Sequence, residues 1–245
     1  MPVLLVTRPE PDASETARQI EALGIETRLA PLLEMKVLET ALPPASGLGA
    51  VALTSANAVN ALTIRDALAP YLDLPAFAVG DRTARVAQDA GFSDVRSAAG
   101  TVEDLAGLLA AEKPAGAVFY PAAHHLSADL AGLLAPSGIE VMTTRVYDMQ
   151  PVNDLAADIA AALEAGSIDG ALFYSRRTAE TFTRLVRNLG LGDQVRAHVT
   201  ALCLSENVAE PLVEARLPRI ALADYSSAEA MLALALSFSR DQIGP

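Results

Sequence analysis

Two short stretches place a serine where an apolar run gives way to a helical pattern. One reads LTSANAV over 53–59 and the other reads FYSRRTA over 173–179, so the serines are Ser55 and Ser175. A serine at this position caps the free backbone N–H groups of the first helical turn. A helix N-terminus also presents N–H donors and partial positive charge to an anion. The two stretches therefore predict two similar corners that can each hold an anionic group.

Other predicted strand-to-helix loops carry the same residue types, and four arginines lie in these loops. Capping alone explains any single hydroxyl residue. A ring of such corners, together with arginines whose planar guanidinium groups suit carboxylates, favours a polyanionic ligand. Several charge-assisted hydrogen bonds can hold that ligand even on an acidic chain, because salt screens distant charges. The predicted ligand-binding residues are Thr7, Arg8, Thr54, Ser55, Ala56, Asn57, Gly80, Arg82, Thr83, Ser175, Arg176, Arg177, Ser205 and Asn207.

The motifs of several other chemistries are missing from the sequence. It contains no GxGxxG, no GxxxxGK[ST] and no GxSxG, so dinucleotide, P-loop and serine-hydrolase sites are not supported. His124 and His125 are adjacent, which is a poor metal geometry without carboxylate or thiolate companions. Cys203 lies in an apolar run and is typical of a buried small hydrophobe. The sequence thus predicts no metal and no cofactor.

Composition excludes further classes of protein. The 245 residues are 51% hydrophobic and carry a net charge of −12, which argues against binding to nucleic acid or to anionic membranes. No apolar run is long enough for a membrane span, and the first apolar stretch is too short for a signal peptide. One cysteine rules out a disulfide framework, so we expect a cytoplasmic protein.

Short β-branched apolar runs alternate with segments whose apolar residues recur every three or four positions. Such alternation predicts an α/β fold with a mostly parallel sheet flanked by helices. Helical patterns include 15–23, 59–68 and 178–189. The predicted strands are Val3–Thr7, Glu26–Leu29, Ala50–Thr54, Ala76–Val79, Asp94–Ser97, Ala117–Tyr120, Glu140–Thr143, Gly170–Tyr174, Thr200–Leu204 and Arg219–Ala223.

Three segments of the chain recur later in similar form, at offsets of 114, 120 and 125 residues. Slowly growing offsets indicate a duplicated five-strand unit with loop insertions. The units could follow one another, or one could be inserted into the other. The sequence GIE occurs at 24–26 and again at 138–140, each time at the start of a predicted strand. An extended segment follows each of these strands, at 31–39 and at 146–152, and this favours insertion. We expect an outer unit of 1–35 plus 150–245, an inserted unit of 40–145, and a two-stranded linker near 32–39 and 146–152, with a cleft between two similar lobes.

Several of these motifs together resemble the uroporphyrinogen-III synthase family. They are LLVTRP, ALTSANAV, VGDRTA followed by AGF, the VY pair at 146–147, and LFYSRRTAETF, in the family's order along nearly the whole chain. The resemblance implies two α/β lobes joined by a two-stranded linker, with no cofactor or metal. It also implies cyclisation of hydroxymethylbilane, a linear tetrapyrrole with eight carboxylates, to uroporphyrinogen III with inversion of ring D. Loss of the terminal hydroxyl gives an azafulvene, and a spiro intermediate then rearranges.

The resemblance also implies roles for individual residues. Thr54, Ser55, Thr83 and Ser175 match substrate-contacting loop positions, and Tyr147 matches a tyrosine that could donate a proton to the leaving hydroxyl. A tyrosine that only packs and hydrogen-bonds locally is the alternative for Tyr147. The chain departs from the family pattern at PAAHHLS (121–127) and at SENVA (205–209). His124 and His125 could replace an arginine there or do nothing, and Glu206 is unusual beside an acidic substrate.

Two other functions remain open at this stage. A non-catalytic two-lobed protein could close on a small polyanionic ligand, and a nucleotide-sugar transferase could share the architecture but lacks donor-site motifs. The resemblance implies the linear tetrapyrrole as the main partner, with the preceding and following pathway enzymes as further partners. It does not indicate whether the pathway leads to heme, siroheme or corrin.

Overall fold

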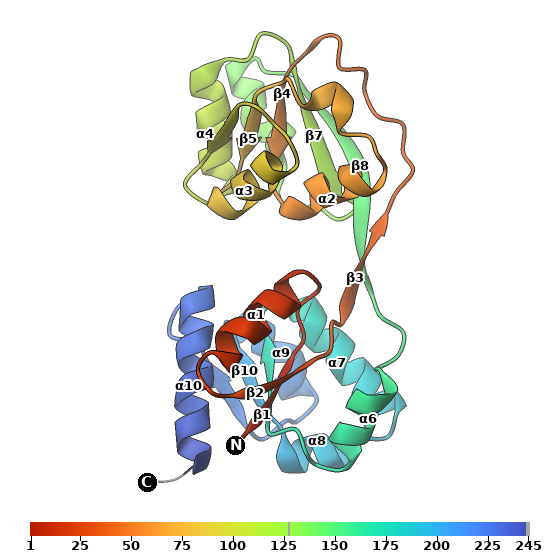
Figure 1. The fold of residues 1–245 in the computed structure, drawn as a ribbon, viewed down its shortest axis with the longest axis vertical. Coiled ribbons are helices and arrows are strands. Elements are labelled where there is room, and N and C mark those ends of the chain that lie inside the picture. Colours follow the sequence, from red (N-terminus) through yellow and green to blue (C-terminus); the bar gives the residue numbers. More distant parts are fainter. Residues whose placement is uncertain (127, 244–245) are drawn as a thin grey trace. The chain divides into compact units, whose positions relative to one another are not determined.

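The computed structural model describes residues 1–126 and 128–243, and it divides the chain into two compact units. Unit 1 consists of Met1–Glu34 and Gln150–Pro245, and unit 2 is Met35–Met149. Figure 1 shows that each unit has a central sheet covered by helices. Unit 1 is therefore built from two separate chain segments, and unit 2 lies between them in the sequence.

Unit 1 contains a five-stranded sheet in the order β11-β10-β9-β1-β2, in which each strand runs parallel to its neighbours. Its elements are β1 (Val3–Val6), α1 (Asp12–Glu21), β2 (Glu26–Leu29), α6 (Ala157–Glu164), β9 (Gly170–Phe173), α7 (Arg176–Asn188), α8 (Gly192–His198), β10 (Thr200–Cys203), α9 (Glu206–Glu214), β11 (Ile220–Leu222) and α10 (Ala228–Ile243).

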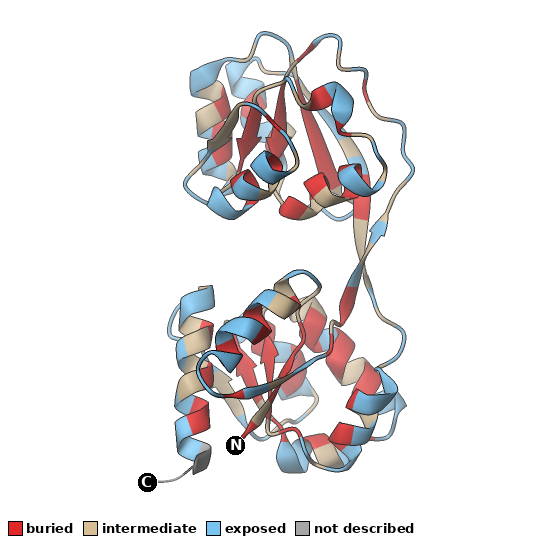
Figure 2. Cartoon of the chain, viewed as in Figure 1, coloured by how far each residue is buried: buried red, intermediate tan, exposed pale blue. Residues whose placement is uncertain are grey.

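Alternating residues of β1 and β9 divide the core of unit 1 into two layers. Leu5 and Phe173 pack with residues of α6, α7, α8 and α9, whereas Leu4 and Leu172 pack with residues of α1 and α10. The central strands are buried on both faces, which explains why they read as continuous apolar runs and not as alternating ones. Figure 2 shows this burial along the strands.

Unit 2 contains a six-stranded sheet in the order β3-β8-β7-β4-β5-β6. Its elements are β3 (Leu33–Val37), β4 (Leu48–Leu53), α2 (Ala56–Ile64), the 3-10 turn η1 (Ala69–Tyr71), β5 (Ala76–Ala78), α3 (Asp81–Asp89), β6 (Val95–Ser97), α4 (Val102–Glu112), β7 (Ala117–Ala123), α5 (Leu130–Leu134), the 3-10 turn η2 (Ala135–Ser137) and β8 (Val141–Pro151). Val51 and Leu53 pack under α2 and α3, and Ala50 and Ala52 pack under α4 and α5.

The two sheets share one strand order when the repeated segments are matched. β2-β1-β9-β10-β11 of unit 1 corresponds to β8-β7-β4-β5-β6 of unit 2. The α/β class with mostly parallel sheets is confirmed. The five predicted strands are present in each sheet, and in unit 2 the predicted linker segment adds a sixth, β3, which pairs with β8 at the sheet edge. The Leu38 N–H donates to the Val146 carbonyl at 2.9 Å, which continues that pairing. No helix among the described residues is long and apolar enough to cross a membrane.

Candidate functional site

Each sheet has one point at which the direction of its connections reverses. In unit 1 this point lies between β1 and β9, and in unit 2 it lies between β7 and β4. Ligands of open parallel sheets bind beyond the carboxyl ends of the strands at this point, because the diverging loops leave a crevice there. Ser175 and Ser55 follow closely after β9 and β4, so the two predicted corners lie at the two reversal points.

Ser55 forms the corner of unit 2 as the N-cap of α2. Its backbone is extended, with φ −157° and ψ 141°, and its hydroxyl oxygen accepts a hydrogen bond from the Asn57 N–H at 3.2 Å. The preceding residue, Thr54, has its Oγ1 3.1 Å from the hydroxyl of Tyr120 on the adjacent strand β7. Asn57 Nδ2 donates to the sulfur of Met149 at 3.6 Å. Cross-strand side-chain contacts therefore hold the corner in place.

Tyr147 lies in β8 and its side chain is 5% exposed. The His124 N–H donates to its carbonyl at 2.7 Å, and its hydroxyl is hydrogen-bonded to Ser55. Burial raises the pKa of Tyr147 above its usual value of 10.0; its hydrogen bond with Ser55 opposes that rise, and the electrostatic interaction with Tyr120 adds to it. The phenol is therefore protonated throughout the physiological range, so it can donate a proton and cannot accept one.

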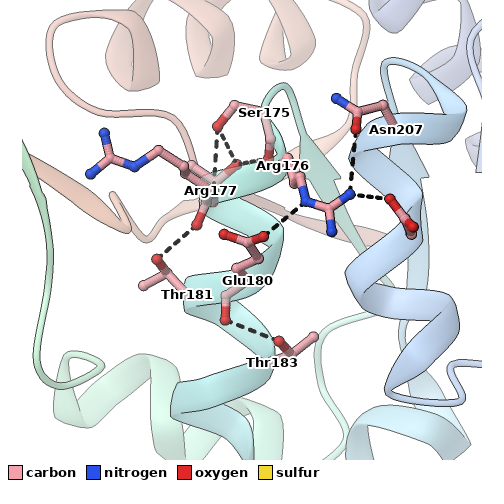
Figure 3. Close-up of polar contacts among 9 residues, drawn as sticks. Ser175, Arg176, Arg177, Glu180, Thr181, Thr183 and Asn207 are labelled. Atoms are coloured by element: carbon pink, nitrogen blue, oxygen red, sulfur yellow. Dashed lines mark hydrogen bonds and ion pairs between the residues drawn. The ribbon is translucent and has the colours of Figure 1, made fainter. Parts of the chain in front are cut away.

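Ser175 forms the matching corner of unit 1 as the N-cap of α7. Its oxygen accepts a hydrogen bond from the Thr178 N–H at 3.2 Å and lies 3.1 Å from the Thr178 hydroxyl. Thr178 in turn donates to the Ser175 carbonyl at 2.7 Å. Figure 3 shows Ser175 at the start of α7, with the side chains of Arg176 and Arg177 extending in different directions.

Arg176 is bound to acidic side chains, which reduces its attraction for an anionic ligand. Its Nε donates to Glu180 at 2.9 Å, and one terminal nitrogen contacts both Glu210 and, at 3.4 Å, the amide oxygen of Asn207 (Figure 3). Its side chain is 37% exposed, so these ion pairs contribute little to stability. Arg176 therefore joins α7 to α9 before any ligand arrives.

Arg8 lies between β1 and α1 and is held on several sides. Its guanidinium stacks over the Tyr174 ring at 4.4 Å, pairs with Asp12 and donates to the Thr16 hydroxyl at 3.3 Å. Its side chain is 22% exposed. Burial lowers the pKa of Arg8, whereas the charge and hydrogen bond of Tyr174 oppose that change. An arginine with this many contacts has a fixed orientation at the reversal point of unit 1.

Comparison with known proteins identifies a family whose model covers most of the chain. The family model described as Uroporphyrinogen-III synthase HemD matches residues 14–233. The chain belongs to the uroporphyrinogen-III synthase family. Membership makes it a lyase-type enzyme that cyclises hydroxymethylbilane in tetrapyrrole biosynthesis.

Solved structures of the family resemble the whole chain. The uroporphyrinogen-III synthetase of Helicobacter pylori is 26% identical, with a TM-score of 0.65 over 97% of this chain and 99% of that chain. A mutant uroporphyrinogen III synthase of the extremely thermophilic bacterium Thermus thermophilus is 19% identical, with a TM-score of 0.51 over 97% and 99%, and shows a shared fold. No curated protein matches the chain in sequence.

Some predicted substrate-binding residues of this family member do not present a side chain to a ligand. Thr7 is fully buried, and its hydroxyl donates to the Leu172 carbonyl at 2.5 Å, so its side chain joins β1 to β9. Ala56 and Thr83 are also buried, inside the first turns of α2 and α3. Gly80 precedes α3 with an extended backbone that any residue could adopt. These positions can offer a ligand only their backbone.

The remaining predicted positions lie on the loops before α3 and α9. Arg82 is exposed and has polar partners of its own. Ser205 precedes α9 without a side-chain capping bond, and Asn207 is exposed and bound to Arg176. The sequence missed Tyr120 and Tyr174, which bind the predicted Thr54 and Arg8. The available signal was a tyrosine near the end of a predicted strand in each unit.

Histidine and cysteine chemistry is not supported by the described residues. His124 and His125 are exposed and contact each other edge-to-face, with ring centres 4.9 Å apart. Ser127, the last residue of the PAAHHLS turn, lies outside the described residues. Burial raises the pKa of Cys203 to about 12, so its thiol is not a nucleophile at neutral pH. Among the described residues, no three His, Cys, Asp or Glu side chains are grouped to hold a metal ion.

Proposed function

We propose that the chain converts hydroxymethylbilane to uroporphyrinogen III with inversion of ring D, using Tyr147 as the acid that protonates the leaving hydroxyl. The observation that carries this proposal is the position of the Tyr147 phenol. It is buried at the carboxyl edge of unit 2, hydrogen-bonded to the N-cap of α2, and its pKa is raised. A protonated phenol held in a fixed orientation can donate a proton to a leaving hydroxyl.

Substrate carboxylates are the natural ligands of the two capped corners. The N-termini of α2 and α7 each present backbone N–H groups at a reversal point. Each helix terminus contributes about 0.3–1 kcal/mol to binding a carboxylate, and each charge-assisted hydrogen bond adds about 1.5–3 kcal/mol. Local donors of this strength support binding of a polyanion despite a net charge of −12.

The remaining chemistry depends on holding the substrate in a productive shape. After water leaves, the azafulvene end must meet the substituted carbon of ring D, and the spiro intermediate must rearrange before water attacks. Positioning of this kind accounts for several orders of magnitude in rate. The protein therefore needs fixed donors more than it needs a set of titrating side chains.

The test is a coupled assay with hydroxymethylbilane that separates isomer III from isomer I, which forms spontaneously. The wild-type chain should yield isomer III, and Tyr147→Phe should lower kcat by about a hundredfold. Tyr225→Phe is the control, because Tyr225 is an exposed tyrosine outside the corners. Full turnover by Tyr147→Phe would remove Tyr147 from the mechanism. Tight substrate binding without any isomer III would instead favour a non-catalytic binding protein.

We further propose that the enzyme works in the cytoplasm beside the enzymes that supply its substrate and use its product. The substrate cyclises by itself to isomer I, so a short transfer path favours isomer III. Fractionation of the source cells and cross-linking to the neighbouring enzymes test this proposal. Recovery of the enzyme in another compartment would contradict it.

A further inference from the structure

Unit 2 carries a second buried tyrosine beside Tyr147 that the proposed mechanism does not use. Tyr120 lies in β7, between β4 and β8 in the sheet, and its side chain is 3% exposed. Figure 1 shows these three strands side by side. A tyrosine this deeply buried needs a partner for its hydroxyl, and that partner is Thr54, 3.1 Å away.

The partners of the two tyrosines are consecutive residues. Tyr120 is bonded to Thr54, and Tyr147 is bonded to Ser55. One peptide unit therefore links the two phenols, and a displacement of Thr54 also displaces the Ser55 hydroxyl that orients Tyr147.

The two tyrosines approach this peptide unit from opposite faces of the sheet. Tyr120 packs with Ala50 and Ala52 on the α4 and α5 face, whereas Tyr147 packs with Val51 and Leu53 on the α2 and α3 face. Their hydroxyls nevertheless interact electrostatically, so Tyr120 acts on Tyr147 both through the backbone of residues 54–55 and directly between the two phenols.

We propose that Tyr120 is a positioning residue for the cyclisation: its bond to Thr54 fixes the end of β4, and the fixed end places Ser55 against Tyr147. This inference rests on the proposed role of Tyr147. The Tyr147 phenol must lie within hydrogen-bond reach of the leaving hydroxyl, and a displacement of about 1 Å can cost up to a hundredfold in rate. Removing the Tyr120 hydroxyl leaves the capping bond of Ser55 but frees the strand end before it.

A double-mutant cycle with Tyr120→Phe, Tyr147→Phe and the double variant tests the proposal in the isomer-III assay. Tyr120→Phe should lower kcat about tenfold and change KM by less than about twofold. The double variant should be no slower than Tyr147→Phe alone, because Tyr120 acts only through Tyr147. Thr54→Val, which removes the same bond, should reproduce the effect of Tyr120→Phe and replaces it if that variant does not fold.

Tyr71→Phe is the matched control. Tyr71 is a buried tyrosine of the same unit, and its hydroxyl donates to the Pro43 carbonyl at 2.7 Å, away from the strand ends. Its loss should lower the melting temperature without changing kcat. Equal kcat for Tyr120→Phe and Tyr71→Phe would overturn the inference. It would also be overturned if the kcat of the double variant fell by the product of the two single losses. If Tyr147→Phe is impaired and Tyr120→Phe is not, only the inference fails. If Tyr147→Phe is fully active, the proposed acid fails as well.

Discussion

Replacing Thr7 with valine separates a structural role from a binding role at one position. The Thr7 side chain is fully buried, and its hydroxyl donates to the Leu172 carbonyl across the β1–β9 pair at 2.5 Å. Valine keeps the shape of threonine but removes the donor. We therefore expect Thr7→Val to destabilise unit 1 and to leave substrate affinity unchanged.

The size of the effect follows from this one contact. A net hydrogen bond contributes about 0.5–1.5 kcal/mol, and leaving a buried carbonyl without its donor costs about 1–3 kcal/mol. The added methyl group offsets part of that loss, so the expected destabilisation is about 1–2 kcal/mol. For a chain of this size, 1 kcal/mol corresponds to about 2–4 °C in melting temperature. The melting temperature should therefore fall by roughly 2–8 °C.

Calorimetry should be combined with hydrogen exchange of β1 and β9 peptides, because a two-unit chain need not unfold in one step. Thr183→Val is the matched control: its hydroxyl donates to the Glu180 carbonyl at 3.0 Å within α7, at a half-buried position of the same unit. That variant should lose less than about 0.5 kcal/mol. An unchanged melting temperature together with a severalfold higher KM for Thr7→Val would refute the reasoning and return Thr7 to the substrate site.

Two further predictions concern the corners and the proposed acid. Ser55→Ala and Ser175→Ala should each lose about 1 kcal/mol of unfolding free energy because both serines cap a helix, whereas Ser205→Ala, which lacks a capping bond, should lose almost nothing in urea denaturation. Only Ser55→Ala should also lower kcat, through Tyr147, and an equal loss of kcat in Ser205→Ala would contradict this. Because burial raises the pKa of Tyr147 above 10.0, its acid form persists as pH rises, so kcat in the isomer-III assay should hold up to about pH 10 and fall only above it. A fall centred below about pH 9 would assign the proton to another group.

Local patterns were enough to find the strand-to-helix corners. Ser55 and Ser175 could be predicted because capping depends on neighbours two or three residues away in the sequence. Their location at the reversal points came only from the strand order in the structure, whereas the repeated segments had indicated that the two units would be alike. The caps and the likeness of the units are encoded within a short window or within a repeat.

Features that depend on distant residues could not be predicted in the same way. The apolar run before Thr7 predicted a strand but did not reveal that its hydroxyl reaches Leu172. Glu210, which binds Arg176, lies on another helix, so the sequence showed a free arginine where the structure shows an ion pair. The two-stranded linker near 32–39 and 146–152 was predicted, but the sequence did not show that β3 joins the sheet of unit 2, because that depends on β8 continuing past its predicted end at Thr143 to Pro151.

The insertion of unit 2 within unit 1 has a consequence for the order of folding. β1 lies between β2 and β9 in the sheet, yet β9 is synthesised only after all of unit 2. During synthesis on the ribosome, β1 and β2 therefore emerge before β9, and the whole of unit 2 is synthesised before β9 can pair with β1. If unit 2 were unstructured, closing this loop of more than a hundred residues would cost unit 1 on the order of 4 kcal/mol in chain entropy. Pairing of β3 with β8 brings the two ends of the loop together and removes most of that cost, so substitutions that unfold unit 2 will also weaken unit 1.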